Sequence, residues 1–315
     1  MDEQAENSCE VIVIVGPTAV GKTAVALELV SDMGGEIISA DSMAVYVGMD
    51  IGTAKPNSEE QKRAQFHLID VADPMQPFSV GEFQKLAASS IEDVLGRNPP
   101  AVIVGGSGLY VRAAVDGLNL EIPGRDENLR AQLADNAREF GNEYVHERLR
   151  LVDPASAERI HPNNLKRVIR AIEICQISGV PASKLFANDA NRPSGYQNAK
   201  WFGLTMNREA LYRRIDKRVD DMIEAGLVDE VADLLNNGID PNLPSMQGLG
   251  YKEIAGYING QYCKEDAVFL LKMNTRRFAK RQYTWFRADD RVKWINLDNM
   301  AAKDASGNIK GELHK

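Results

Sequence analysis

The sequence is poor in the residues that form metal cages and disulfide frameworks. Its 315 residues include only three cysteines and four histidines. Cys9, Cys175 and Cys263 are odd in number and lie far apart, without any paired spacing. This pattern excludes a zinc site and a set of disulfides, and it predicts idle, reduced thiols.

Long apolar runs are also absent. The first ten residues, Met1 to Glu10, are acidic and polar, and the longest aliphatic run near the start is Val11–Val15. A membrane span needs about 20 apolar residues, and a secretion signal needs a basic segment before an apolar one. We therefore expect a cytoplasmic protein, neither exported nor inserted into a membrane, and we expect it to be a monomer.

The composition is that of a globular protein, with 44% hydrophobic and 26% charged residues. The formal net charge of −8 argues against indiscriminate coating of nucleic acid. Residues 272–293, however, hold eight basic side chains and two aspartates, so this stretch carries +6 and the rest of the chain −14. A basic stripe on an acidic body indicates one anionic partner, held in one place.

Short apolar runs alternate with helical periodicity from Val11 to about Val115. The runs are continuous, as expected of parallel strands buried on both faces, and segments such as Lys22–Met33 and Val80–Leu95 have helical spacing. This order predicts an α/β sheet with right-handed crossovers. The predicted strands are Val11–Val15, Ile37–Ser39, Phe66–Asp70, Ala101–Val104, Lys200–Leu204 and Val292–Asn296.

After Gly117 the chain becomes helical and charged, and strands return only near residue 200. We therefore expect an α/β core at residues 1–117 and 199–299, interrupted by an all-helical insertion at 118–198. The segment Asn188–Asn198, rich in Asn, Ser, Gly and Pro, is expected to be the return linker. The small, polar tail at 300–315 is expected to be disordered.

Residues 16–23 match the phosphate-binding motif G-x-x-x-x-G-K-[ST]. The motif lies between a strand and a helix in proteins that use it, and here it follows the first predicted strand and begins the first predicted helix. Gly16 and Gly21 allow a tight turn, so that several backbone N–H groups converge on one anion, and the helix N-terminus adds partial positive charge. Lys22 supplies a full charge, and the Thr23 hydroxyl can ligate Mg²⁺. The core is thus predicted to be P-loop NTPase-like, a parallel sheet flanked by helices. The predicted phosphate-binding residues are Gly16, Pro17, Thr18, Ala19, Val20, Gly21, Lys22 and Thr23.

Two aspartates lie at or just beyond the ends of predicted strands. Asp41 should emerge at the carboxyl edge of the sheet, beside the phosphate loop, where it could accept a proton or hold a metal through water. A capping role is the alternative, because Asp41-Ser42 also suits a helix start. Asp70 is either a Walker B carboxylate or a strand-end cap. The strand ending at Val104 runs into Gly105–Gly108, where many NTPases carry an acid.

Motifs over nearly the whole chain resemble the tRNA dimethylallyltransferase (isopentenyltransferase) family. The chain lacks the zinc extension of some eukaryotic relatives, so it is similar to the compact bacterial form. Ser107 replaces the commoner Thr, and Asn164 stands where the family usually has Asp. The similar segments are Gly16–Thr23, Ile38–Ser42, Tyr46, Gly48–Pro56, Val104–Tyr110, Arg159–Asn163, Gly250–Glu253 and Thr275–Arg287.

The resemblance implies that the loop holds the pyrophosphate of dimethylallyl diphosphate. The implied acceptor is N6 of the adenosine just 3′ of the anticodon, in a tRNA anticodon stem-loop. Asp41 is the implied general base, Arg218 and Lys22 stabilise the pyrophosphate, and Thr23 ligates Mg²⁺. The implied tRNA contacts are Asp41, Ser42, Met43, Ala44, Ser107, Arg130, Lys166, Arg167, Arg170, Gln247, Gly250, Tyr251, Lys252, Lys280, Arg281, Gln282, Trp285 and Arg287.

Several structural alternatives remain open at this stage. Arg218 could lie on a solvated helix face, and Trp285 and Phe286 could pack in the core instead of stacking on bases. Two other functions also fit the sequence. One is a nucleotide or small-metabolite kinase, with Lys166–Arg170 as part of a lid. The other is a non-catalytic RNA-binding module that uses the loop as a nucleotide-gated switch.

Overall fold

The structure, a computed structural model, describes residues 11–120, 124–187 and 196–313. It consists of two compact units, the first formed by Met1–Asp116 and Gly195–Lys315 and the second by Gly117–Ser194. The expected insertion at 118–198 differs from the second unit by only a few residues at each end. Cys9 and most of the expected linker Asn188–Asn198 lie outside the described residues.

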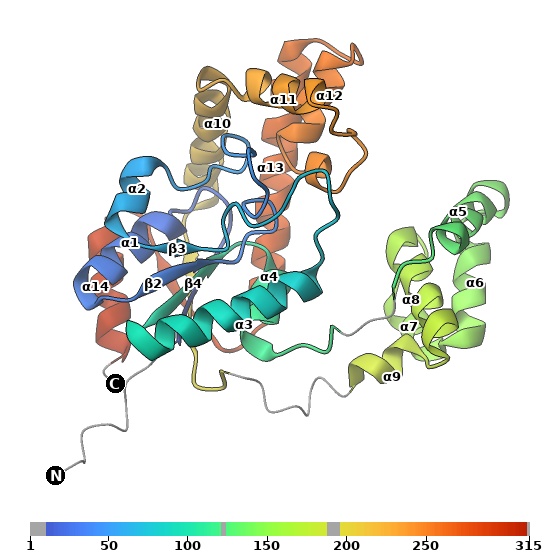
Figure 1. The fold of residues 1–315 in the computed structure, drawn as a ribbon, viewed down its shortest axis with the longest axis horizontal. Coiled ribbons are helices and arrows are strands. Elements are labelled where there is room, and N and C mark those ends of the chain that lie inside the picture. Colours follow the sequence, from blue (N-terminus) through green and yellow to red (C-terminus); the bar gives the residue numbers. More distant parts are fainter. Residues whose placement is uncertain (1–10, 121–123, 188–195, 314–315) are drawn as a thin grey trace. The chain divides into compact units, whose positions relative to one another are not determined.

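Unit 1 contains one sheet of six parallel strands in the order β3-β2-β4-β1-β5-β6 (Figure 1). Strands β1 and β4 are buried along their whole length, as a sheet covered on both faces requires. The predicted α/β fold class is confirmed. The strands are β1 Val11–Val15, β2 Glu36–Ser39, β3 Phe66–His67, β4 Ala101–Gly105, β5 Lys200–Thr205 and β6 Val292–Asn296.

Strand β3 is shorter than the predicted Phe66–Asp70. Leu68 and Asp70 have φ angles of 64° and 54°, in the left-handed region. Backbone in that region cannot continue an extended strand, so pairing with β2 stops at His67.

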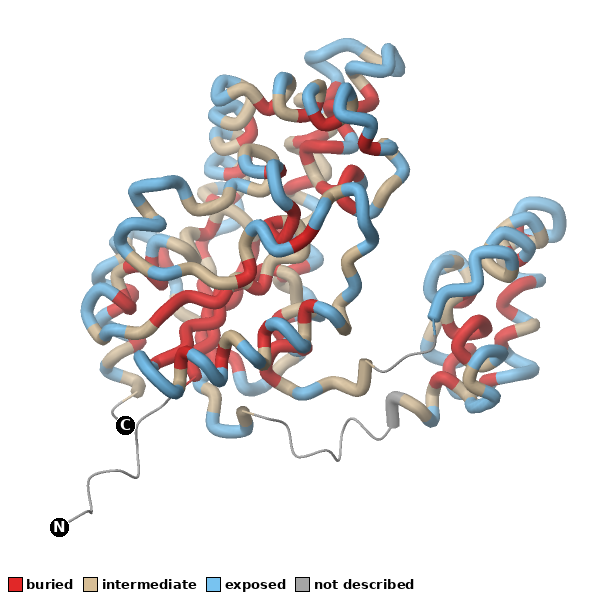
Figure 2. The backbone as a smooth tube through the Cα atoms, viewed as in Figure 1, coloured by how far each residue is buried: buried red, intermediate tan, exposed pale blue. Residues whose placement is uncertain are grey.

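Helices cover both faces of the sheet (Figure 1). Helices α1 (Lys22–Met33) and α14 (Ala302–Leu313) pack together on one face, and α3 (Val80–Arg97) and α4 (Gly108–Asp116) pack on the other. Figure 2 shows buried residues along the strands and on the helices that pack around them. The remaining helices of unit 1 are α2 Ser58–Arg63, α10 Arg208–Glu224, α11 Leu227–Asn236, the 3₁₀ helix η2 Ser245–Gln247, α12 Tyr251–Ile258 and α13 Lys264–Arg287.

Helix α14 contradicts the expectation that residues 300–315 are disordered. Ala302, Ala305 and Ile309 recur at helical spacing, and Ala305 and Ile309 are fully buried in the main core, where α14 packs on α1. The prediction failed because it weighed overall polarity above the spacing of a few apolar residues.

Unit 2 is all helical and has its own apolar core. Its central side chains include Leu133, Val145, Leu149, Val168 and Ile172, all at most 1% exposed. The helices are α5 Glu127–Phe140, α6 Asn142–Val152, α7 Pro154–Arg159, α8 Leu165–Ser178 and α9 Ala182–Ala187.

The order of the strands locates a crevice at the carboxyl ends of β1 and β4. The helices that follow these adjacent strands, α1 and α4, lie on opposite faces of the sheet. Ligands of open parallel sheets bind where the connections diverge in this way.

Candidate active site

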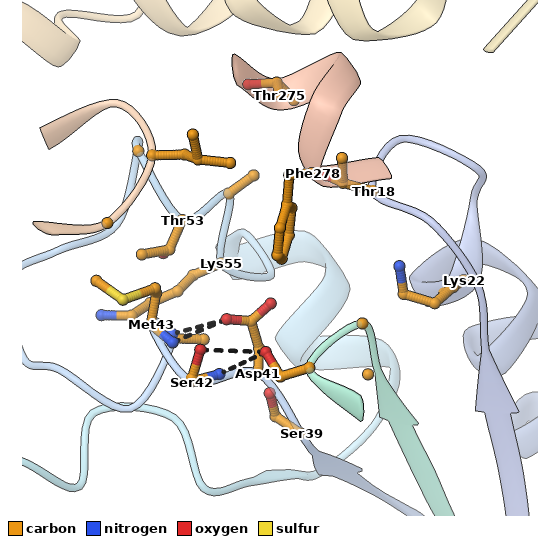
Figure 3. Close-up of a pocket in the computed structure, with 18 of the residues that line it drawn as sticks. Thr18, Lys22, Ser39, Asp41, Ser42, Met43, Thr53, Lys55, Thr275 and Phe278 are labelled. Atoms are coloured by element: carbon orange, nitrogen blue, oxygen red, sulfur yellow. Dashed lines mark hydrogen bonds between the residues drawn. The ribbon is translucent and has the colours of Figure 1, made fainter. Parts of the chain in front are cut away.

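A cavity of about 400 Å³ opens at this edge of the sheet (Figure 3). The loops after β1, β2 and β4 line it together with α10 and α13. The four side chains expected to be catalytic, Lys22, Thr23, Asp41 and Arg218, all line this one cavity. Among the other lining residues are Thr18, Ser42, Ser107, Phe278, Arg281 and Gln282.

The phosphate loop depends on glycine. Gly16 has a φ of 146°, and a Cβ added there would lie 2.6 Å from the backbone oxygen of Leu204. Gly21 has a φ of 110° where α1 begins, a conformation that L side chains rarely adopt. The Lys22 ammonium donates to the carbonyl oxygens of Gly16 and Pro17, at 3.1 and 2.9 Å.

Two desolvated cations share the cavity. Burial and, to a lesser extent, nearby Arg218 lower the pKa of Lys22 to about 8, although Asp41 opposes the shift. Burial also lowers the pKa of Arg218, with Asp41 again opposing. The guanidinium of Arg218 donates to the Thr53 carbonyl at 3.4 Å. Two cations with one carboxylate leave excess positive charge, which favours an anionic ligand.

Asp41 makes the capping contacts that its sequence position suggested, and it also lines the cavity. Its Oδ1 accepts hydrogen bonds from the backbone N–H groups of Met43 (2.8 Å) and Ala44 (3.4 Å), as a capping aspartate does. Figure 3 shows the other carboxylate oxygen directed into the cavity, beneath the ring of Phe278. One oxygen therefore fixes the side chain, and the other faces the space for a ligand.

Glycines in Gly105–Gly108 let other parts of the chain approach closely. A Cβ at Gly106 would lie 2.2 Å from Nε2 of Gln282, and a Cβ at Gly108 would lie 2.2 Å from the indole of Trp285. Ser107 bonds to Ser42, with 3.1 Å between the two hydroxyl oxygens. This segment therefore joins the loops after β2 and β4 to α13.

Lys55, a distinctive motif residue without an expected role, holds the loop of residues 48–56 together. Its ammonium donates to the Tyr46 carbonyl (2.6 Å), Asp50 (2.6 Å) and Asp70 (2.5 Å), and its side chain is only 4% exposed. Asp70 does not line the cavity that holds Lys22 and Thr23. We therefore assign Asp70 to this ion pair and not to a Walker B role.

Glu230, at the first turn of α11, supports the same loop from outside. Its carboxylate accepts from the backbone N–H groups of Asp50, Ile51 and Gly52, at 2.9, 2.8 and 3.2 Å, and from the hydroxyl of Tyr251 at 2.7 Å. No local motif marks Glu230 in the sequence, and the loop residues that it supports lie about 180 positions earlier.

Two of the expected tRNA contacts have side chains that are bonded within the protein. Tyr251 is fully buried, with its hydroxyl bonded to Glu230, and Gln282 is 5% exposed, with both ends of its amide bonded within the protein. Phe286 packs in the core, whereas Trp285 is 40% exposed. Ala44 and Gly250 are also buried.

The remaining expected tRNA contacts reach the surface to different degrees. Asp41, Ser42, Met43, Ser107, Arg130 and Arg170 are partly exposed. In unit 2, Arg130 and Arg170 both pair with the buried Glu173. The exposed residues are Lys166, Arg167, Gln247, Lys252, Lys280, Arg281, Trp285 and Arg287.

Two further properties concern only residues 11–120, 124–187 and 196–313. No helix in these ranges has the length and apolarity needed to cross a membrane. Within these ranges, no group of three or more His, Cys, Asp or Glu side chains is arranged so that it could bind a metal ion.

The fold and the cavity define a P-loop protein of the α/β class, with a glycine-rich anion cradle beside an aspartate. The family model described as IPP transferase matches residues 44–289, and that described as isopentenyl transferase matches residues 9–73. The chain therefore belongs to the IPP transferase family, as its motifs indicated.

The similarity to known proteins extends over almost the entire chain. The tRNA dimethylallyltransferase of Desulforudis audaxviator is 46% identical over 306 residues, which cover 96% of this chain and 98% of that protein. The crystal structure of the Bacillus halodurans tRNA isopentenylpyrophosphate transferase has a TM-score of 0.72 at 42% identity, covering 98% and 97% of the two chains. A eukaryotic dimethylallyltransferase, described as acting on tRNA, has a TM-score of 0.76 at 26% identity and covers 96% and 78%.

Proposed function

We propose that the protein transfers a dimethylallyl group from dimethylallyl diphosphate to N6 of the adenosine immediately 3′ of the anticodon of tRNA. The observation that carries this proposal is the meeting of Lys22, Arg218 and Asp41 in one cavity, because the reaction needs cations for a leaving diphosphate and a base for an amine proton. The names of the relatives point to the same reaction.

The reaction breaks a C–O bond and an N–H bond, and it forms a C–N bond and an O–H bond. The bond between the allylic carbon and the diphosphate oxygen breaks, and the electron pair leaves with the diphosphate. The amine nitrogen bonds to that carbon, and its proton passes to the cavity-facing oxygen of Asp41. Lys22, Arg218 and the loop amides stabilise the growing negative charge, and each such preorganised donor typically contributes about 3 kcal/mol.

A magnesium ion fits the donors present. Mg²⁺ typically keeps several waters and binds through one or two protein oxygens together with phosphate oxygens. The Thr23 hydroxyl would ligate it directly and Asp41 through water, since both line the cavity. When bound, the ion would neutralise part of the diphosphate charge.

The tRNA would bring its target base unstacked, because N6 of a stacked adenine is hard to reach. We assign the exposed basic residues to RNA phosphates. They are Lys280, Arg281 and Arg287 on α13, Lys252 on α12, and Lys166 and Arg167 on α8. Trp285, exposed on the same helix α13, offers an aromatic face for base stacking.

Mass spectrometry of tRNA nucleosides tests the proposal. Purified protein, tRNA, dimethylallyl diphosphate and Mg²⁺ should give an adenosine heavier by one dimethylallyl unit, and Asp41→Ala should lose this product. ATP turnover without the heavier nucleoside would instead indicate a kinase. An Asp41→Ala protein that modified tRNA normally would disprove the assigned base.

A further inference from the structure

A side chain from the far end of the sequence caps the phosphate loop. Gln282, on α13, accepts a hydrogen bond from the Thr18 backbone N–H through Oε1 at 2.8 Å. Its Nε2 donates to the carbonyl oxygen of Gly106 at 3.0 Å. One loop amide that could have donated to a phosphate is thus bonded within the protein, by a buried side chain.

This amide lies beside the ammonium of Lys22. A Cβ at Gly106 would lie 2.2 Å from Nε2 of Gln282 and 3.5 Å from Nζ of Lys22, so the three groups border one small volume. In P-loop nucleotide complexes the loop amides cradle the α- and β-phosphates, and the lysine reaches the β- and γ-phosphates. The Gln282 amide thus lies in the region where, in those complexes, the lysine meets the outer phosphates.

We propose that Gln282 makes the loop selective for a diphosphate over a triphosphate. The side chain fills the volume that a third phosphate would need, and it withholds the Thr18 N–H. A triphosphate would have to displace a buried amide and leave the Gly106 carbonyl without this donor, which costs free energy. Specificity is a difference between two affinities, and rejection of one ligand is a common way to achieve it.

The end of β4 is consistent with this assignment. Many NTPases carry an acid there, whereas this chain has Gly105 and Gly106. Because Gly106 lacks a side chain, the Gln282 amide can occupy the adjacent space. The inference rests on the proposed function, since it takes a diphosphate as the ligand of the loop.

Calorimetry with inorganic pyrophosphate and inorganic triphosphate, at constant free Mg²⁺, tests the inference. We expect the wild-type protein to prefer pyrophosphate, and Gln282→Ala to reduce that preference about tenfold, equivalent to about 1.4 kcal/mol. Gln282→Met keeps most of the volume but frees the Thr18 N–H and the Gly106 carbonyl, so its preference should lie between those of the wild type and the alanine variant. A methionine variant as permissive as the alanine variant would overturn the steric explanation.

The outcomes separate this inference from the proposed function. A wild-type protein that bound neither anion would contradict the proposed diphosphate site itself. Equal binding of the two anions by the wild type, or an unchanged preference in Gln282→Ala, would overturn only the role of Gln282. Thermal unfolding checks that each variant is folded, and Gln282→Asn, too short to reach both partners, serves as a second truncation with the same expectation.

Discussion

Because of its surroundings, Lys22 changes its charge within the pH range of ordinary assays. Burial lowers the pKa of this lysine to about 8. Below that pH the free protein presents an ammonium to the ligand, and above it a neutral amine. A diphosphate that binds above pH 8 must therefore recover the charge by taking up a proton from solvent.

Pyrophosphate affinity should consequently be almost constant between pH 7 and the lysine pKa of about 8, and fall at higher pH. The limiting decrease is about tenfold per pH unit, because one proton is taken up per ligand bound. Calorimetry in buffers of different ionisation enthalpy measures both the affinity and the proton uptake. Lys22→Arg keeps its charge, so its profile should be flat over this range, and a flat wild-type profile would contradict the prediction.

Replacement of the proposed base should separate chemistry from binding. We expect Asp41→Asn to lower kcat for prenyl transfer roughly 10²–10⁴-fold, the usual contribution of a general base. Pyrophosphate binding should be preserved or strengthened, because a negative charge leaves a cavity that holds two cations. Single-turnover kinetics and calorimetry measure the two effects. Asp73→Asn, an exposed aspartate, is the matched control, and equal losses in both variants would exclude a specific role for Asp41.

At the scale of elements, helix α8 is anchored by a buried carboxylate. Glu173 is completely buried and accepts hydrogen bonds from Arg130 and from the Asp126 N–H at 2.7 and 2.8 Å, while Arg170 pairs with it from the same helix. Burial alone would raise the pKa of Glu173, but the hydrogen bonds from Arg130, Arg170 and Asp126 outweigh it and lower the pKa to about 2.

The stabilisation from this lowered pKa is complete above the ordinary glutamate value of 4.5 and is lost as pH falls toward 2. We expect Glu173→Gln to cost about 1–3 kcal/mol near neutral pH. Its melting temperature should also fall less steeply than that of the wild type between pH 4.5 and 2. Calorimetric melts over this range test both statements, and parallel pH profiles would contradict the assigned role. Glu147→Gln, at an exposed pair on α6, is the control.

Helix α14 should contribute to stability through one fully buried side chain. Ile309→Ala leaves a cavity against α1, and such substitutions cost about 2–5 kcal/mol. Lys303→Ala, on the exposed side of the same helix, should change stability by less than about 0.5 kcal/mol. Urea unfolding measures both free energies, and equal values would mean that α14 does not pack in solution as it does here.

Local sequence patterns were sufficient to predict most of the strands and helices of the fold. The continuous apolar run at Val11–Val15 and the helical spacing of Lys22–Met33 are found as β1 and α1 with the same limits. The prediction of a disordered tail was wrong because the packing of Ala305 and Ile309 in the core outweighs the polar composition of this segment. At the cavity, the position of Asp41 followed from sheet topology. The positions of Glu230 and Gln282 could not, because their partners are distant in sequence and meet them only in the folded chain.

For the whole molecule, the affinity for tRNA should fall steeply as the salt concentration rises. Binding would depend on contacts between RNA phosphates and a few basic side chains of a protein whose net charge is −8. Each phosphate contact adds about 0.7–0.9 to the slope of log affinity against log salt. Removal of Lys166 and Arg167, both exposed, should lower that slope by about 1.5. Filter binding at several salt concentrations measures it.

The control removes two arginines of the same unit that already pair with neighbouring acids. Arg138 bonds to Asp135, and Arg150 pairs with Glu147. Their joint replacement by alanine should leave the slope unchanged. An affinity that barely changed between low and moderate salt would contradict the assignment of the basic residues to phosphates.

The bond between Thr18 and Gln282 spans 264 positions, and Glu230 lies 180 positions after Asp50. Ribosomes deliver the amino-terminal part of a chain first, so the loop that carries Thr18 is synthesised long before the side chain that caps it. Translation that stopped before α13 would yield the phosphate loop without its cap. Assembly of the complete cavity thus coincides with the end of synthesis, and truncated products would carry only an unfinished anion cradle.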